Sequence, residues 1–255
     1  MSSEGTVHVQ TENRTTWITL DRAPLNIMDI PMMQALGKAL YDIAGQCDFI
    51  VFQGAGPKGF SAGAEVRDHT PERVREMLTA FHGVFRQLWR ADIVTIAQVH
   101  GYCLGGGCEL ASFCDFVIAG ESAMFGQPEI RLGCYPPVAL VLYPALVGPR
   151  AALHLLLTGR SFSAREAYEM GLVTRVVADE DVRGEVDTLL SELRSLSPLV
   201  LRMVRRALWR EIGLDFERHL AEAEEMYHDE LMKTEDAVEG IRAFIEKRSP
   251  AWRGR

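Results

Sequence analysis

The chain has 255 residues, 47% of them hydrophobic and 24% charged, a composition typical of a folded protein that excludes disorder as the default. Its formal net charge is −8 and its Lys and Arg residues form no long run, so neither nucleic acid nor an anionic membrane is expected as the main partner. The N-terminal MSSEGTVHVQ lacks the pattern of a secretory signal. No apolar run in the sequence reaches the roughly 20 residues that a membrane-spanning helix needs.

The cysteines are five in number, and Cys103, Cys108 and Cys114 lie in one short segment. Free thiols in a reducing cytoplasm explain this odd number better than disulfides do. A zinc site is the alternative, but the C-x4-C-x5-C spacing matches no metal-binding knuckle. We therefore expect a cytoplasmic protein without a bound metal.

Short apolar runs alternate with amphipathic stretches in the first third of the chain. Residues 6–20 alternate apolar and polar side chains around a Glu-Asn-Arg turn, which predicts a β-hairpin. Apolar residues at helical spacing predict helices over 30–45 and 71–91. The apolar run 49–52, which is followed by glycines, predicts a buried strand.

The same alternation continues toward the middle of the chain. Residues 93–99 and 116–119 predict two more buried strands, with a helix of small residues at 108–113 between them. Strands and helices that repeat at this spacing predict an α/β fold with parallel strands.

From about residue 185 the pattern becomes helical only. No strand signal separates the predicted helices, which cover 186–195, 198–210, 214–232 and 235–247. The sequence thus predicts two parts, an α/β core over residues 1–184 that contains the site and a helical region over residues 185–255.

Two glycine-containing segments can present unpaired backbone N–H groups. Residues 58–67, KGFSAGAEVR, place small residues before a charged helix start, and a plain turn is the alternative. Residues 99–111, VHGYCLGGGCELA, run from a strand through three glycines into a helix. Such a helix start can bind an anion or an oxyanion, and a tight packing turn is the alternative.

Two glutamates accompany these segments. Glu109 follows the three glycines, and Glu129 follows a proline between apolar stretches in residues 123–133, AMFGQPEIRLG. Partial burial would raise the pKa of such a carboxyl group toward the range of an acid–base catalyst. For either glutamate alone, a surface or helix-start carboxylate is the alternative.

Together these segments resemble the crotonase, or enoyl-CoA hydratase/isomerase, superfamily over residues 7–252. The resemblance rests on five ordered matches: FSAGAEV, VHGYCLGGGCELASFCD, FGQPEIRLG, LTGRSFSAREAYEMGLV (157–173) and EGIRAFIEKRSPAW (239–252). It implies a spiral α/β core of repeated ββα units with a helical C-terminal region that forms a trimer or a dimer of trimers. It also implies an acyl-CoA thioester substrate, whose coenzyme A is the only cofactor.

The resemblance assigns roles to individual residues by position. The backbone amides of Ala64 and Gly106 would form an oxyanion hole for the thioester oxygen, with Ala62 beside them in the substrate pocket. Glu109 would act as base toward a water molecule and Glu129 as acid toward the α-carbon. The two glutamates can also exchange these roles through that water.

One loop departs from the family pattern. Hydratases of the family carry a Pro-Gly-Ala-Gly-Gly stretch where this chain reads CYPPVA over residues 134–139. Tyr135, Pro136 and Pro137 would therefore wall the substrate pocket rigidly and suit a cyclic or bulky acyl group. With PLNIMDI at 24–30, this loop resembles cyclohexa-1,5-diene-1-carbonyl-CoA hydratases, which add water to a conjugated ring diene.

Other functions and other residues remain open. Isomerisation, decarboxylation and thioester hydrolysis occur on the same scaffold, and a catalytically silent CoA-binding or RNA-binding relative is the non-enzymatic alternative. Glutamates at both positions favour addition or elimination of water. His69 and His100 are expected to be structural histidines. Arg22 and Lys58 are expected either to be solvated or to reach CoA phosphates.

Overall fold

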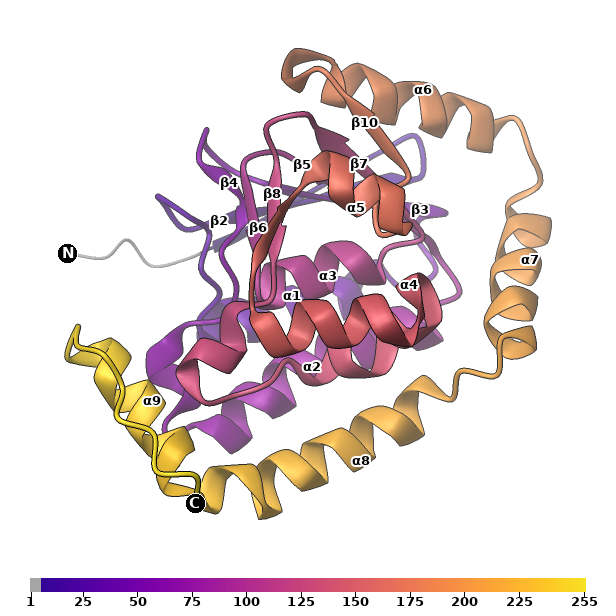
Figure 1. Ribbon diagram of the computed structural model, residues 1–255. Coiled ribbons are helices and arrows are strands. Elements are labelled where there is room, and N and C mark those ends of the chain that lie inside the picture. Colours follow the sequence, from indigo (N-terminus) through magenta and orange to yellow (C-terminus); the bar gives the residue numbers. More distant parts are fainter. Residues whose placement is uncertain (1–5) are drawn as a thin grey trace.

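The computed structural model describes residues 6–255, which form two β-sheets surrounded by helices (Figure 1). The larger sheet has the order β1-β2-β3-β5-β7-β10, and only the β1–β2 hairpin is antiparallel. Its strands are β1 (Thr6–Glu12), β2 (Thr15–Asp21), β3 (Phe49–Gly54), β5 (Val94–Val99), β7 (Phe116–Gly120) and β10 (Arg175–Val177). The predicted hairpin and parallel strands are therefore confirmed.

The second sheet is small and has the order β4-β6-β8-β9. The strands β4 (Gly59–Ser61), β6 (Tyr102–Leu104) and β8 (Met124–Gly126) run parallel, and β9 (Ser161–Ser163) is antiparallel to β8. Each of these strands has three residues. Segments this short show no alternation, which is why the sequence did not predict them.

The two sheets are linked by a repeated unit of two strands and a helix. In each turn the chain contributes one strand to the large sheet and the next strand to the small sheet, and then enters a helix. The three helices are α2 (Val74–Arg90), α3 (Gly106–Phe113) and α4 (Pro137–Thr158). This arrangement confirms the predicted spiral of ββα units.

The first helix, α1 (Ile30–Ile43), begins where the sequence supplies a helix start. The side chain of Asp29 accepts a hydrogen bond from the Met32 N–H at 3.0 Å, and Pro31 occupies the first turn. A capping box of Ser163 and Glu166 starts α5 (Ala164–Met170) in the same way. Short 3₁₀ helices complete the core: η1 (Val66–His69), η2 (Pro128–Leu132) and η3 (Asp179–Asp181).

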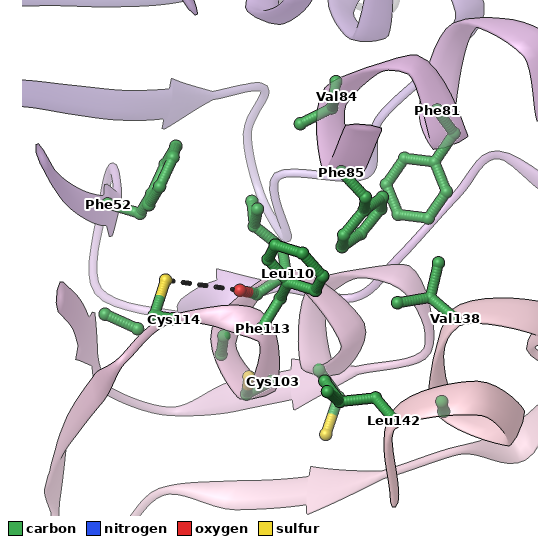
Figure 2. Packing of buried hydrophobic residues seen from close by; sticks show 14 of the residues in the cluster. Phe52, Phe81, Val84, Phe85, Cys103, Leu110, Phe113, Cys114, Val138 and Leu142 are labelled. Atoms are coloured by element: carbon green, nitrogen blue, oxygen red, sulfur yellow. Dashed lines mark hydrogen bonds between the residues drawn. The ribbon is translucent and has the colours of Figure 1, made fainter. Parts of the chain in front are cut away.

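Helices cover both faces of the large sheet, because alternate side chains of its central strands point to opposite faces. Ile50 and Phe52 of β3 join the main hydrophobic core, whereas Phe49 and Val51 pack with α6 (Val182–Arg194). Figure 2 shows the main core between α2 and α3, where Phe85 and Phe113 meet edge to face with ring centroids 5.2 Å apart. Such aromatic pairs add to the stabilisation from burial alone.

The C-terminal helices follow the predicted order. They are α6, α7 (Pro198–Glu211), α8 (Phe216–Asp229), the 3₁₀ turn η4 (Leu231–Lys233) and α9 (Glu235–Ile245), and they wrap around the outside of the core (Figure 1). The predicted boundary between residues 184 and 185 falls inside α6, so the helical region begins at Val182. The apolar side chains of α6 face inward: Leu189, Leu190 and Leu193 are buried against the sheet of the same chain.

A different helix presents an apolar face to solvent. The side chains of α7 that expose more than half of their surface are Leu199, Val200, Met203, Val204 and Leu208. They recur at intervals of three or four residues and therefore form one stripe along the helix. Contiguous apolar surface of this kind marks an interaction site.

One helix, α4, is long and apolar enough by length and composition to cross a membrane, which corrects the expectation that no segment reaches that length. Its helical geometry is broken at Gly148, where φ is 78°, and Pro149 follows. The helix also packs against α3 and α8, and Val138, Leu142 and Leu155 are fully or almost fully buried. These contacts bury one face of α4 in the core, while 28% of its most apolar 18-residue window is buried in all.

Candidate functional site

Ala64 lies in an extended segment that pairs with residues 25–28. The Met28 N–H donates to the Gly63 carbonyl oxygen, and the Glu65 N–H donates to the Met28 carbonyl oxygen, both at 2.8 Å. In such a pairing the N–H groups of successive residues point in opposite directions. The Ala64 N–H therefore points away from residues 25–28 and remains free for another acceptor.

Gly106 supplies a second backbone donor next to the first. It is the first residue of α3, so its N–H has no carbonyl group one turn earlier in the helix. A Cβ atom placed on Gly63 would lie 3.0 Å from the Gly106 nitrogen, and one placed on Gly106 would lie 3.4 Å from the Ala64 nitrogen. The two N–H groups thus lie close together at a helix N-terminus, an arrangement that can hold an oxyanion.

Glu109 lies in the first turn of α3, where 3% of its surface is exposed. Its Oε1 atom accepts a hydrogen bond from the Ala139 N–H at 2.9 Å, so the loop that departs from the family pattern still supplies a backbone donor. Burial raises the pKa of this carboxyl group to about 7. Glu109 therefore exchanges protons in the neutral pH range.

Glu129 lies on η2, across Gly105 from Glu109. The Glu109 N–H donates to the Gly105 carbonyl oxygen at 2.9 Å, and a Cβ atom placed on Gly105 would come within 2.7 Å of Glu129 Oε1. Burial, and then repulsion from Glu109, hold the pKa of Glu129 well above its usual range. The raised pKa favours the protonated form of Glu129, while Glu109 is partly ionised at neutral pH.

A buried polar chain leads from Glu129 to α4. The Gln127 side-chain amide finds a complementary partner for each of its atoms in one orientation only. In this orientation its nitrogen donates to Glu129 Oε2 at 3.2 Å and to the Gly105 carbonyl oxygen at 3.3 Å. Its oxygen accepts from the Tyr143 hydroxyl at 2.8 Å. The Tyr143 hydroxyl also lies 3.3 Å from Ser112 Oγ. Gln127 and Tyr143 are fully buried, so these bonds fix the amide that faces the carboxyl group.

The carboxyl group of Glu129 faces a cavity of about 470 Å³. The predicted residues Ala62 and Ala64 also line this cavity, together with apolar side chains such as Leu25, Ile27, Val66, Leu132 and Phe244. Gly105 also lines it, and the Glu109 N–H donates to the Gly105 carbonyl oxygen, which places the start of α3 beside the cavity. The structure thus brings both predicted donor segments and one predicted glutamate to a single, largely apolar cavity.

The predicted wall formed by Tyr135, Pro136 and Pro137 does not line the cavity. The Tyr135 hydroxyl donates to the Ala223 carbonyl oxygen of α8 at 2.9 Å, which draws the side chain toward that helix. Pro136 is buried, and Pro137 begins α4. Through Ala139 this segment contacts Glu109, and its expected role in shaping the acyl pocket stays a prediction.

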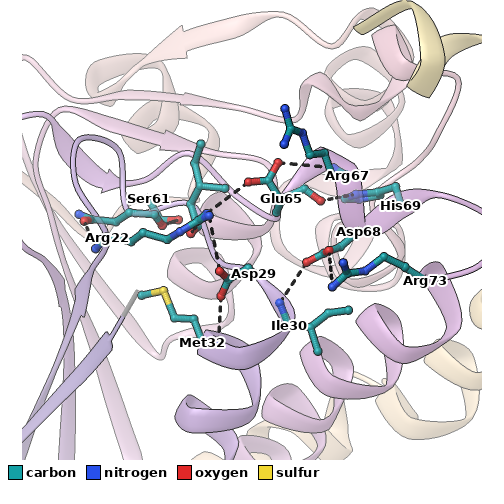
Figure 3. A network of polar contacts seen from close by, with 12 residues as sticks. Arg22, Asp29, Ile30, Met32, Ser61, Glu65, Arg67, Asp68, His69 and Arg73 are labelled. Carbon is teal, nitrogen blue, oxygen red and sulfur yellow. Dashed lines mark hydrogen bonds and ion pairs between the residues drawn. The ribbon is translucent and has the colours of Figure 1, made fainter. Parts of the chain in front are cut away.

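A polar network holds the Ala64 segment against the start of α1 (Figure 3). Arg22 donates to the Ile27 carbonyl oxygen at 3.0 Å and to Glu65 Oε2 at 3.3 Å, and it lies 3.5 Å from Asp29 Oδ2. With these three partners, Arg22 acts in this structure as a structural residue rather than as a free cation for a phosphate group. Lys58, the other cation considered, is exposed.

The two histidines considered from sequence differ in environment. His100 follows β5, and its Nε2 atom lies 2.8 Å from the Gly56 carbonyl oxygen, as expected for a structural histidine. His69 ends η1 and lines the cavity beside Ala64 and Glu129. Its place at the cavity was missed because η1 shows no periodicity that predicts which side chain points inward.

Comparisons with known proteins match this chain along nearly its whole length. The family model described as enoyl-CoA hydratase/isomerase matches residues 10–255. Cyclohexa-1,5-dienecarbonyl-CoA hydratase of Thauera aromatica is 35% identical, covering 93% of this chain and 92% of that protein. A probable enoyl-CoA hydratase of Rhizobium meliloti is 37% identical and covers 98% of both. The crystal structure of an enoyl-CoA hydratase from Mycobacterium avium subsp. paratuberculosis superposes with a TM-score of 0.87 at 25% identity, covering 97% of this chain and 98% of the other.

Proposed function

Since this chain belongs to the enoyl-CoA hydratase/isomerase family, we propose that it adds water to, or eliminates it from, a conjugated enoyl- or dienoyl-CoA thioester. The observation that carries this proposal is the grouping around Gly105. Two carboxyl groups of raised pKa flank a turn that presents two backbone N–H donors, and Glu129 opens onto an apolar cavity. The coenzyme A of the substrate is the only cofactor the reaction requires.

The backbone amides of Ala64 and Gly106 would bind the thioester oxygen. Water addition to a conjugated thioester places negative charge on this oxygen as an enolate forms. Donors fixed before the reaction, in a site from which water is largely excluded, stabilise this charge by several kcal/mol. The hydrogen bonds between residues 25–28 and 62–65, and the start of α3, hold the donors in place.

The two glutamates would divide the proton transfers. Glu109, with a pKa of about 7, is partly ionised at neutral pH and can take a proton from water as its oxygen attacks carbon. The raised pKa of Glu129 favours its protonated form, which would give its proton to the α-carbon. After hydration Glu109 holds a proton and Glu129 is ionised, so a proton returns from Glu109 to Glu129 through a water molecule before the next hydration. Elimination of water runs the two transfers in reverse.

Tyr143 is a positioning residue in this scheme, because its hydroxyl fixes the Gln127 amide with the nitrogen toward Glu129. We expect Tyr143→Phe to lower kcat by roughly tenfold without changing KM, since one lost buried hydrogen bond frees the amide to turn its oxygen toward the carboxyl group. Steady-state kinetics test this, with Tyr168→Phe on the exposed face of α5 as the control. An unchanged kcat in Tyr143→Phe would remove Tyr143 from the mechanism.

For the acyl group, we propose a conjugated ring diene of the cyclohexadienecarbonyl type. The similarity to the Thauera aromatica protein and a cavity of about 470 Å³ with largely apolar walls support this choice. The proline-rich start of α4 would contribute by holding Glu109 through the Ala139 N–H in its first turn.

We expect kcat/KM for cyclohexa-1,5-diene-1-carbonyl-CoA to exceed that for crotonyl-CoA. Both rates can be followed by the loss of absorbance of the conjugated thioester, with product analysis by mass spectrometry. A gain of one water identifies hydration, whereas a product of unchanged mass indicates isomerisation. If crotonyl-CoA is preferred by tenfold or more, about 1.4 kcal/mol in transition-state binding, a general enoyl-CoA hydratase replaces the ring-diene proposal.

We also propose that the enzyme forms a trimer or a dimer of trimers through the apolar stripe of α7. Sedimentation velocity at micromolar concentration should then show a species several times heavier than the 28.5 kDa chain. Replacing Val204 and Leu208 by Glu should dissociate it, because each substitution places a charge in the apolar contact. A 28.5 kDa species of the unmodified protein would contradict this assembly. All five cysteines are free and buried, which fits the cytoplasmic location that we propose.

A further inference from the structure

His69 is a polar side chain of the cavity to which the proposed mechanism gives no role. It ends η1, five residues after Ala64, and lines the cavity together with Ala64 and Glu129. The residue is 9% exposed. A histidine this deeply buried is stable only when its ring nitrogens have suitable partners or access to solvent or a ligand.

The hydrogen bonding of His69 fixes its tautomer. Its Nδ1 atom lies 3.0 Å from the Glu65 carbonyl oxygen, which can only accept a hydrogen bond, so Nδ1 carries the hydrogen. Burial lowers the pKa of the imidazole, which is therefore neutral at pH 7. Nε2 then carries a lone pair, and among residues 6–255 no group bonds to it. Unlike the Nε2 atom of His82, it is not sealed from solvent.

The surrounding network holds this ring in place (Figure 3). Asp68, next to His69, accepts from the Ile30 N–H at 3.0 Å and pairs with Arg73 at 3.0 Å. Glu65, whose carbonyl oxygen binds the ring, is itself paired with Arg22. These contacts hold η1 in place, and turning the imidazole away would break the bond between Nδ1 and the Glu65 carbonyl oxygen.

The lone pair of His69 complements the other polar groups of the cavity. The Ala64 N–H offers a hydrogen, and the raised pKa of Glu129 favours the protonated carboxyl group, which offers another. The Glu65 carboxylate, which also lines the cavity, is engaged by Arg22. His69 Nε2 is thus an uncharged acceptor that suits an O–H group on the bound acyl chain, and addition of water to a carbon–carbon double bond produces such a group.

We propose that His69 is a specificity-determining residue whose Nε2 atom accepts a hydrogen bond from the hydroxyl group of the acyl chain, so that the cavity recognises hydroxyacyl-CoA thioesters. The proposal rests on the proposed function for the origin of the hydroxyl group. It does not depend on which unsaturated acyl group is the natural one. A merely structural histidine would instead affect all ligands alike.

A matched pair of ligands isolates the hydroxyl group. Pivaloyl-CoA and 3-hydroxypivaloyl-CoA differ by one hydroxyl, and neither has an α-hydrogen, so elimination of water to an enoyl thioester is impossible. Isothermal titration calorimetry of the full-length protein should show 3-hydroxypivaloyl-CoA binding about tenfold more tightly. His69→Leu should abolish this preference, His69→Gln should retain part of it through its amide oxygen, and Val66→Ala should weaken both ligands alike.

The outcomes separate the two proposals. If the unmodified protein shows no preference, or if His69→Leu keeps the preference or weakens both ligands equally, His69 does not recognise the hydroxyl group. An unchanged melting temperature of His69→Gln shows that the variants report on binding rather than on folding. Failure of the unmodified protein to hydrate either crotonyl-CoA or the ring diene would refute the hydratase proposal alone. The affinities of the ligand pair are measured without catalytic turnover and so do not depend on it.

Discussion

Replacing Glu129 by Gln should lower kcat at least about 10²-fold while leaving the affinity for the thioester nearly unchanged. Glutamine keeps the shape of the side chain but has no proton to give to carbon. The affinity should persist because the backbone donors of Ala64 and Gly106, rather than the carboxyl group, hold the thioester oxygen. Single-turnover kinetics and a separate measurement of Kd distinguish the two effects.

Glu121→Gln is the matched control, because Glu121 is an exposed glutamate in the turn after β7 and should not affect kcat. Glu109→Gln should cause a loss comparable to that of Glu129→Gln. The unmodified enzyme should lose activity as pH falls through about 7, since Glu109 is then protonated and cannot act as base. A loss of thioester affinity as large as the loss of rate would indicate that the glutamates support the structure instead.

Replacing Gly63 by Ala should lower activity about as much as Glu129→Gln does, because the backbone and the space at Gly63 do not suit a larger residue. Gly63 has φ of 98°, which an L-residue adopts only with strain, and the added Cβ would lie 2.9 Å from the Leu104 carbonyl oxygen and 3.0 Å from the Gly106 nitrogen. The segment of Ala64 would have to move away from α3. We expect kcat/KM to fall by at least about 10²-fold, because displacing one oxyanion donor costs this much in other enzymes.

The control for this substitution is Gly83→Ala in the middle of α2, where a Cβ would meet no atom within 4 Å. It should leave activity unchanged and raise the free energy of unfolding by roughly 0.5–1 kcal/mol, because alanine favours a helix interior over glycine. Thermal unfolding of both variants, followed by circular dichroism, gives the comparison. A fully active Gly63→Ala enzyme would show that the two donor segments need not be in contact.

The parts of the fold that were predictable are those with a strong local signal. The long amphipathic pattern of residues 71–91 and the apolar runs of β3, β5 and β7 gave the core elements within a few residues. The three-residue strands of the small sheet carry no such signal, because their pairing depends on the connection between the sheets. For α6, periodicity revealed an apolar face but not that the sheet of the same chain covers it.

The residues of the candidate site likewise divide into those that a local sequence signal predicts and those that it does not. Ala64, Gly106 and Glu129 follow from local motifs, since a glycine turn and a helix start act through the backbone. The contributions of Tyr143 and His69 depend on residues distant in sequence or on the direction of a side chain in a 3₁₀ turn. The bond from Tyr135 to Ala223, 88 residues away in the chain, could not be inferred from the loop itself.

The spacing of strands in the small sheet is also related to the angle that the Ala64 and Gly106 N–H donors would make at the thioester oxygen. Ala64 and Gly106 follow the ends of β4 and β6, which are neighbouring parallel strands. Neighbouring strands lie about 4.8 Å apart. Two nitrogens at that separation, each about 2.9 Å from a shared oxygen, subtend an angle of roughly 110° at it, near the roughly 120° between the lone pairs of a carbonyl oxygen. A separation of the Ala64 and Gly106 nitrogens close to the strand spacing would thus match the proposed oxyanion hole to its ligand, whatever side chain residue 64 carries.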